Sequence, residues 1–134
     1  LGKTYLLCCI AHRLADRGVL PVYTSAYHFL ELARKGYMEN SSAPLSPLLN
    51  APLLLIDDLG TELPNSFTVS QFFLCINERI LRKKSTLISS NLDMEALRSI
   101  YSERTLSRII SSYTIRQLPG SDIRIKKKLY NTNS

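Results

Sequence analysis

The chain has 134 residues, a formal net charge of +6 and 45% hydrophobic residues, which is typical of one globular domain. No apolar run approaches the length of a membrane-spanning helix, so the sequence argues against an integral membrane protein. Cys8, Cys9 and Cys75 follow no disulfide or metal-ligand spacing. We therefore expect reduced thiols in a cytoplasmic protein.

The excess positive charge lies in the last quarter of the chain. Residues 1–97 carry nine basic and nine acidic side chains, whereas residues 98–134 carry eight basic and two acidic ones. A basic segment of this kind favours polyanionic ligands such as nucleotide phosphates or nucleic acid. For Lys126, Lys127 and Lys128 the alternative is a solubilising tail.

Residues 1–4 read Leu-Gly-Lys-Thr and lead into a helical apolar pattern over residues 3–17. This is the end of a phosphate-binding P-loop, G-x-x-x-x-G-K-[ST], followed by a helix. Gly2 is the second glycine of the motif. In that motif the ammonium of Lys3 reaches the β- and γ-phosphates, and the hydroxyl of Thr4 binds Mg²⁺. The first glycine of the motif and the strand before it do not occur in this sequence. We therefore expect the sequence to be a piece of a longer protein.

Two short elements follow before the next motif. Residues 21–25 predict a strand, and residues 26–35 predict a helix that ends near Gly36. Residues 38–51 contain serines and prolines and predict a loop with a short helical turn.

Residues 53–60 read Leu-Leu-Leu-Ile-Asp-Asp-Leu-Gly. A continuous apolar run suits a strand buried on both faces of a sheet, and ligands of open α/β sheets lie beyond the carboxyl ends of the strands. Two acids at that position are costly unless they hold a cation or activate a water. This is the pattern of a Walker B element, in which Asp57 holds Mg²⁺ and Asp58 polarises the attacking water. The alternative, a core strand ending in a solvated turn, is disfavoured by the P-loop sequence at the start of the chain.

The second half continues the alternation of helices and strands. Residues 67–83 predict a long amphipathic helix, and residues 86–90 predict a strand with Asn91 at its carboxyl end. The amide of Asn91 could orient the lytic water or contact the γ-phosphate. The alternative for Asn91 is an N-cap of the following helix.

The alternation predicts an α/β fold with a parallel sheet covered on both faces. We divide its single domain into an α/β core over residues 1–118 and a basic C-terminal segment over residues 119–134. The last predicted elements are short helices over residues 94–100 and 103–111, a strand over residues 113–118, a turn at Pro119-Gly120 and a strand over residues 123–125.

The ordered motifs LGKT, LLLIDDLG, LISSNLD and YSERTLSRI resemble the AAA+ ATPase domain of DnaC/DnaI-type replicative helicase loaders. IstB-type transposition helper ATPases are close relatives. The Asp-Asp-Leu-Gly ending is telling, because most AAA+ proteins have Asp-Glu at that point. The resemblance implies a three-layer P-loop NTPase core whose first strand and start of the P-loop lie outside this sequence.

The resemblance also implies ATP and Mg²⁺ as cofactors, and it assigns roles to individual residues. The roles are Walker A for Gly2, Lys3 and Thr4, Walker B for Asp57 and Asp58, sensor I for Asn91, arginine finger for Arg108 and sensor II for Arg124. Arg104 lies four residues before Arg108, and we expect it to form an ion pair and not to act as the finger.

The leading functional hypothesis is an ATP-hydrolysing loader that delivers a replicative helicase onto single-stranded DNA. The implied partners are the helicase, through a region absent from this chain, single-stranded DNA, and further copies arranged head to tail. One alternative is a transposition helper ATPase that prefers duplex DNA. The other is a non-catalytic assembly or DNA-binding remnant, which the incomplete P-loop motivates.

Overall fold

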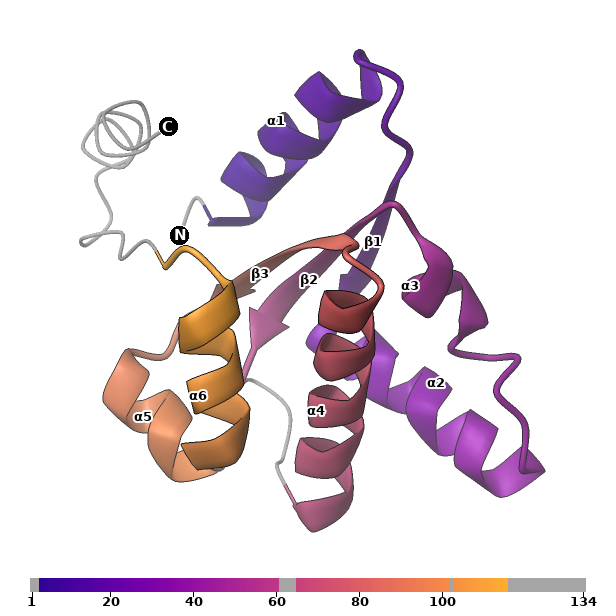
Figure 1. Cartoon of the computed structure of the whole chain (residues 1–134), viewed down its shortest axis with the longest axis vertical. Helices are drawn as coiled ribbons and strands as arrows, with labels where there is room; N and C mark the ends of the chain where they lie inside the picture. The colour runs from indigo at the N-terminus through magenta and orange to yellow at the C-terminus, as the bar shows by residue number, and fades with distance from the viewer. Residues whose placement is uncertain (1–2, 61–64, 102, 116–134) are drawn as a thin grey trace.

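The computed structural model describes residues 3–60, 65–101 and 103–115. Within these residues, three parallel strands form one sheet in the order β1-β2-β3 (Figure 1). The strands are β1 (Pro21–Ser25), β2 (Leu53–Leu59) and β3 (Ser85–Ser90). The described helices are α1 (Lys3–Ala15), α2 (Ala26–Glu39), α3 (Ser46–Asn50), α4 (Ser66–Leu81), α5 (Met94–Ile100) and α6 (Glu103–Ser112).

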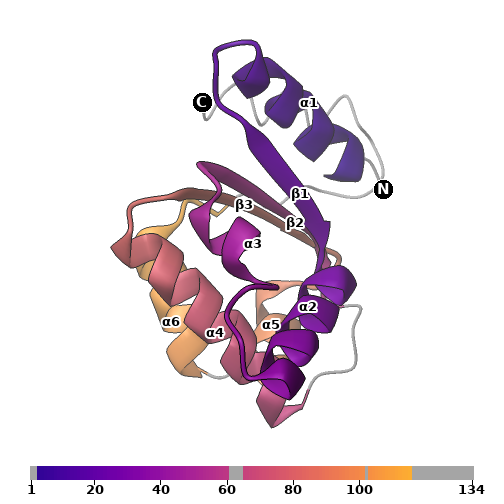
Figure 2. The ribbon, with the colours of Figure 1, turned by 90° about the vertical axis from the view of Figure 1, so that its right-hand side faces the viewer.

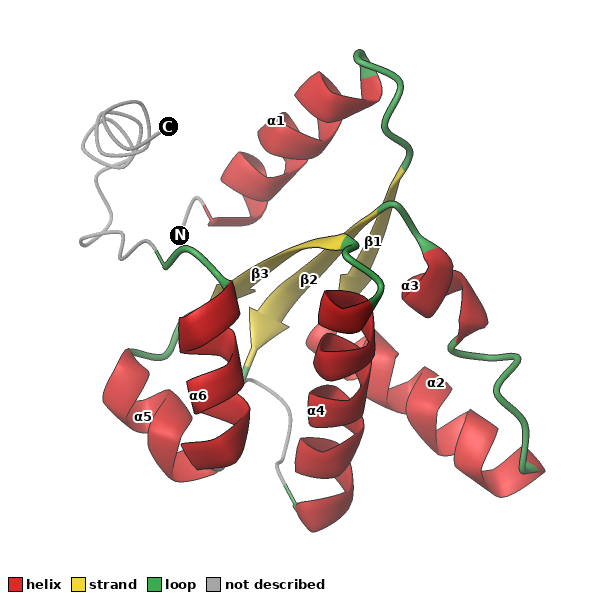
Figure 3. Cartoon of the chain, viewed as in Figure 1, coloured by secondary structure: helices red, strands yellow, loops and turns green. Residues whose placement is uncertain are grey.

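The sheet is the middle of three layers. Helix α1 covers one face, and the other helices lie on the opposite face (Figures 1 and 2). Because successive side chains of a strand point to opposite faces, Leu53 and Leu55 pack with Leu7 of α1, whereas Leu54 and Ile56 belong to the larger core on the other face. Figure 3 shows the same arrangement by element type. The predicted α/β three-layer fold is confirmed.

Strand β2 and its neighbours match the sequence expectations closely, but the end of α2 does not. The helix continues to Glu39, and Asn40 caps it in the left-handed conformation with φ 50°. The prediction that the helix ends near Gly36 is therefore wrong. Gly36 is buried inside the helix, and a Cβ there would lie 2.8 Å from the carbonyl oxygen of Ser41. The missing side chain of Gly36 allows the following loop to pack closely against the helix, and the glycine does not end the helix.

The strand predicted over residues 113–118 does not begin at Tyr113 in the structure. The N–H of Tyr113 donates to the carbonyl of Ile109 at 2.8 Å, which extends the last turn of α6, and residues 114–115 follow without strand structure. The rest of that strand, the turn at residues 119–120 and the strand at residues 123–125 lie outside the described residues, as does the whole predicted C-terminal segment. Among the described helices, none is both long and apolar enough to cross a membrane.

The side chain of Arg79 in α4 connects this helix with α3 and β3 through hydrogen bonds. Its side chain is 0% exposed. Its Nε donates to Thr86 Oγ1 of β3 at 2.8 Å, and its terminal nitrogens donate to the carbonyls of Leu48 in α3 at 2.6 Å and Ser85 at 2.7 Å. Arg79 therefore satisfies buried backbone acceptors that would otherwise destabilise the fold.

Arg79→Ala should lower the free energy of unfolding by on the order of 3 kcal/mol, because it leaves buried carbonyls without donors. Arg98→Ala is the matched control, since Arg98 is exposed and pairs with Glu103 at 3.2 Å. We expect the control to change stability by less than ~1 kcal/mol. Urea unfolding measures both values, and equal losses would contradict the role given to Arg79.

Candidate active site

The carboxylate of Asp57 is the centre of the site, at the carboxyl end of β2, and is 1% exposed. Its Oδ2 accepts hydrogen bonds from the Thr4 hydroxyl at 2.6 Å and from the Tyr23 hydroxyl at 2.7 Å. Its Oδ1 accepts from the Ser89 hydroxyl and from the backbone N–H of Asp58 at 3.1 Å. A carboxylate offers about four acceptor positions, so these donors use all of them.

These contacts determine the charge of Asp57. Burial alone would raise its pKa, but the hydrogen bonds from Ser89, Thr4, Tyr23 and the Asp58 N–H outweigh burial and lower the pKa below its ordinary value. The donated hydrogen bond to Asp57 conversely raises the pKa of Tyr23 to about 12. Asp57 is therefore an anion at neutral pH, in a form suited to holding a cation.

The end of β2 is shaped by a change of register. The pairing of β2 with β3 is regular up to Ile56 and shifts before Leu59. Asp58 lies in this irregularity with a left-handed φ of 60° and an exposed side chain. Gly60 follows with φ 99°, and a Cβ there would clash with Leu92 Cδ1. The Asp-Asp-Leu-Gly sequence therefore buries one carboxylate, exposes the next and needs glycine at its end.

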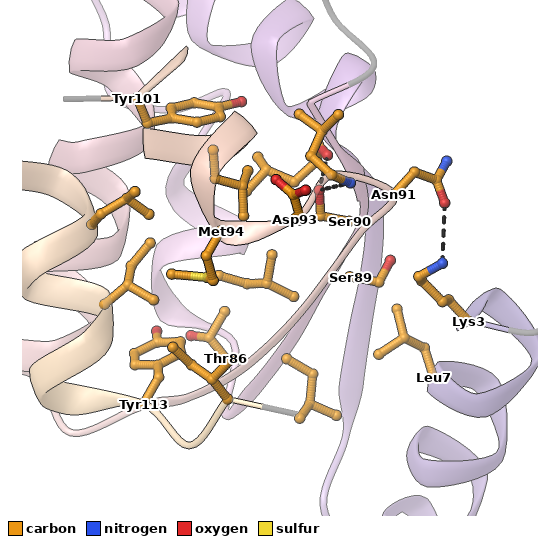
Figure 4. A pocket seen from close by; sticks show the side chains of 18 of the residues that line it. Lys3, Leu7, Thr86, Ser89, Ser90, Asn91, Asp93, Met94, Tyr101 and Tyr113 are labelled. Carbon is orange, nitrogen blue, oxygen red and sulfur yellow. Dashed lines mark hydrogen bonds between the residues drawn. The ribbon is translucent and has the colours of Figure 1, made fainter. Parts of the chain in front are cut away.

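The first residue of α1 reaches the end of β3. Lys3 Nζ donates to Asn91 Oδ1 at 3.3 Å, as Figure 4 shows. The N-cap of α5 is Asp93, whose side chain accepts from the N–H of Ala96 at 2.8 Å. The alternative reading of Asn91 as the N-cap is therefore wrong. The structure brings together Lys3 with Asn91 and Thr4 with Asp57, at one edge of the sheet.

The predicted arginines of α6 lie elsewhere. Helix α6 packs on the face of the sheet opposite α1. The guanidinium carbon of Arg104 lies 4.6 Å from the centroid of the Phe73 ring, which is a cation–π contact, and the ion pair expected for Arg104 stays a prediction. Arg108 is half-buried, and its Nε has no hydrogen-bond partner among the described residues. Gly2 and Arg124 lie outside the part of the chain that the structure describes.

Two residues of the site, Tyr23 and Ser89, escaped the sequence reasoning. Ser89 could have been found, because parallel pairing places the end of β3 beside Asp57. Tyr23 gave no such signal, since an exposed tyrosine in a short strand is common. Its reach to Asp57 depends on the length of the phenol and on both residues facing α1.

A mainly apolar groove of about 650 Å³ opens beside this edge (Figure 4). Lys3 and Asn91 lie at its polar end. Consecutive residues of β3 line it together with apolar side chains of α1, α5 and α6. One edge of β3 is unpaired within the described residues.

The donors at this site fit Mg²⁺ shared with a nucleotide. Mg²⁺ is commonly held by one or two carboxylates together with substrate phosphates and waters. The Thr4 hydroxyl and the Asp57 carboxylate are adjacent and supply oxygen ligands. The described residues contain no group of three or more His, Cys, Asp or Glu side chains that could hold an ion.

The fold of the chain is similar to solved structures of replication proteins. The DnaC helicase loader matches with a TM-score of 0.76 and 23% identity, over 84% of this chain and 70% of that one. DnaI matches with a TM-score of 0.62 and 27% identity, over 97% and 63%. The replication initiator DnaA, bound to AMPPCP and single-stranded DNA, matches with a TM-score of 0.74 and 25% identity, over 98% and 42%.

No protein-family model and no curated protein sequence matches the chain. The chain spans less than half the length of the DnaA structure. The structural neighbours confirm the predicted resemblance to DnaC/DnaI-type AAA+ domains and connect the chain with AAA+ proteins of DNA replication.

Proposed function

We propose that the full-length protein is a Mg²⁺-dependent ATPase of DNA replication that loads a replicative helicase onto single-stranded DNA. The observation that carries this proposal is the contact of Thr4 with Asp57 beside the contact of Lys3 with Asn91. It brings the predicted Walker A, Walker B and sensor I residues to the carboxyl ends of parallel strands, where α/β proteins bind ligands. DnaA, a structural neighbour, carries a nucleotide analogue and single-stranded DNA.

Each residue has a distinct task in this proposal. Lys3 attracts the β- and γ-phosphates, and Thr4 and Asp57 hold Mg²⁺, which would neutralise phosphate charge. Asp58 polarises the attacking water, and its side chain is exposed near the carboxyl end of β2. Asn91 orients that water or contacts the γ-phosphate. Phosphoryl transfer requires this positioning and charge stabilisation and little covalent chemistry by the protein.

The loader function extends the proposal to partners. The helicase would bind through a region outside this chain, and single-stranded DNA would bind to copies assembled head to tail in the cytoplasm. Arg124 and the basic residues 119–134 are the proposed sources of further phosphate contacts. A clear preference of the full-length protein for duplex DNA would indicate the transposition helper instead.

Nucleotide binding is the direct test of the site. Lys3→Ala in the full-length protein should weaken binding of a fluorescent ATP analogue by roughly 10- to 100-fold, because a charged hydrogen-bond donor to the phosphates is lost. Arg13→Ala, a change on the exposed far end of the same helix, is the control and should bind as the wild type does. If the wild type binds no nucleotide, or if Lys3→Ala binds equally well, the non-catalytic remnant becomes the better interpretation.

A further inference from the structure

The buried carboxylate of Asp57 has no acceptor position left for a metal. Four protein donors contact it, two on each oxygen. Mg²⁺ or one of its waters needs a lone pair of the same carboxylate. One of the four donors must therefore break its hydrogen bond to Asp57 when the metal binds.

Three of the four donors cannot readily break their hydrogen bonds to Asp57. Ser89 is buried, and its hydroxyl also accepts the Asp58 N–H at 3.2 Å, so its position is fixed from two sides. The Asp58 N–H belongs to the backbone at the end of β2. Thr4 can keep donating its proton to Asp57 while its oxygen lone pair faces the metal, as the P-loop role of this residue requires.

Tyr23 differs from the other three. Tyr23 as a whole is 51% exposed, so we expect its hydroxyl to exchange Asp57 for water at little cost. It donates to Oδ2, the oxygen that also faces Thr4 and is therefore on the side of the proposed metal. It lies on β1, which pairs only with β2 among the described strands, so no described strand restrains the other edge of β1.

We propose that Tyr23 is a positioning residue that holds Oδ2 of Asp57 in the metal-free site and is displaced from it when Mg²⁺ and nucleotide bind. This inference rests on the proposed function. It makes Tyr23 a competitor of the metal for one oxygen atom. Tyr23 thereby keeps the buried carboxylate satisfied while the site is empty, and it raises the Mg²⁺ concentration needed to fill the site.

The consequence can be measured as the Mg²⁺ dependence of nucleotide binding. In the full-length protein, Tyr23→Phe removes the competing hydroxyl and keeps the ring. The Mg²⁺ concentration at half-maximal binding of a fluorescent ATP analogue should fall by about tenfold, the order expected for one hydrogen bond to a charged acceptor. Tyr27→Phe, an exposed tyrosine of α2, is the matched control and should leave the midpoint where it is.

A second measurement observes the displacement itself. In protein labelled with ¹³Cζ-tyrosine, the resonance absent from Tyr23→Phe belongs to Tyr23. That resonance should move when Mg²⁺ and nucleotide are added together and stay in place with nucleotide alone. A merely structural role for the hydroxyl would leave both the resonance and the Mg²⁺ midpoint unmoved.

The outcomes separate this inference from the function on which it rests. An unchanged or raised Mg²⁺ midpoint in Tyr23→Phe, with wild-type nucleotide binding intact and sensitive to Lys3→Ala, overturns the inference alone. Absence of Mg²⁺-dependent nucleotide binding in the wild type overturns both. A lower midpoint together with a Mg²⁺-dependent shift of the Tyr23 resonance supports the displacement.

Discussion

Asp58→Asn should bind ATP as the wild type does and hydrolyse it roughly 10²- to 10⁴-fold more slowly, the range attributed to a general base. The substitution removes the charge that polarises water and keeps the size of the side chain. Asparagine accepts the left-handed φ of 60° found at this position. The backbone N–H of residue 58 still donates to Asp57 Oδ1, so the buried carboxylate keeps its contacts.

The measurement is steady-state ATP hydrolysis by the full-length protein, with analogue binding measured in parallel. Asp93→Asn supplies an equivalent change of charge three positions beyond β3. Asp93 caps α5, and asparagine is an equally good N-cap, so fold and hydrolysis should be preserved. Hydrolysis at the wild-type rate by Asp58→Asn would show that another group activates the water.

The sequence predicted most of the fold because its main signals were local. The apolar run ahead of Asp57 and the helical spacing in residues 67–83 needed no knowledge of distant contacts. The failures were at places where tertiary structure decides. Gly36 looks like a helix end in the sequence, yet it serves a close approach of a loop. Tyr113 begins an alternating pattern, but its N–H continues the hydrogen bonding of α6.

In the site, as in the fold, some features could be predicted from the sequence and others depend on tertiary structure. The pairing of Thr4 with Asp57 could be anticipated, because the two motifs complement each other and their chain positions fit one α/β unit. Parallel pairing could have suggested Ser89, but the donor from Tyr23 depends on strand order and register, which periodicity does not give. Sequence therefore located the charged groups, and only the structure showed how the buried carboxylate is satisfied without a metal.

Arg108 gives the second large expected effect. Arg108→Ala should bind ATP normally, and its rate of hydrolysis should fall by a factor on the order of 10³ or more, the loss typical of a fully used arginine finger. Arg108 lies on α6, on the face of the sheet opposite α1, whereas Lys3 and Thr4 begin α1. We expect the arginine to act on the nucleotide of a neighbouring copy. Such a contact is head to tail and builds rings or open spirals.

Mixing two inactive variants tests this arrangement directly. Asp58→Asn retains the finger, and Arg108→Ala retains the group that activates water. If equal amounts assemble at random, about one quarter of the interfaces join an intact Asp58 to an intact Arg108, and the same fraction of wild-type hydrolysis should return. Each variant alone, at the same total concentration, should stay inactive. If the two variants assemble together without recovering hydrolysis, Arg108 does not act across the interface. Arg104, whose guanidinium stacks on Phe73, or a purely structural role for Arg108, is then the better explanation.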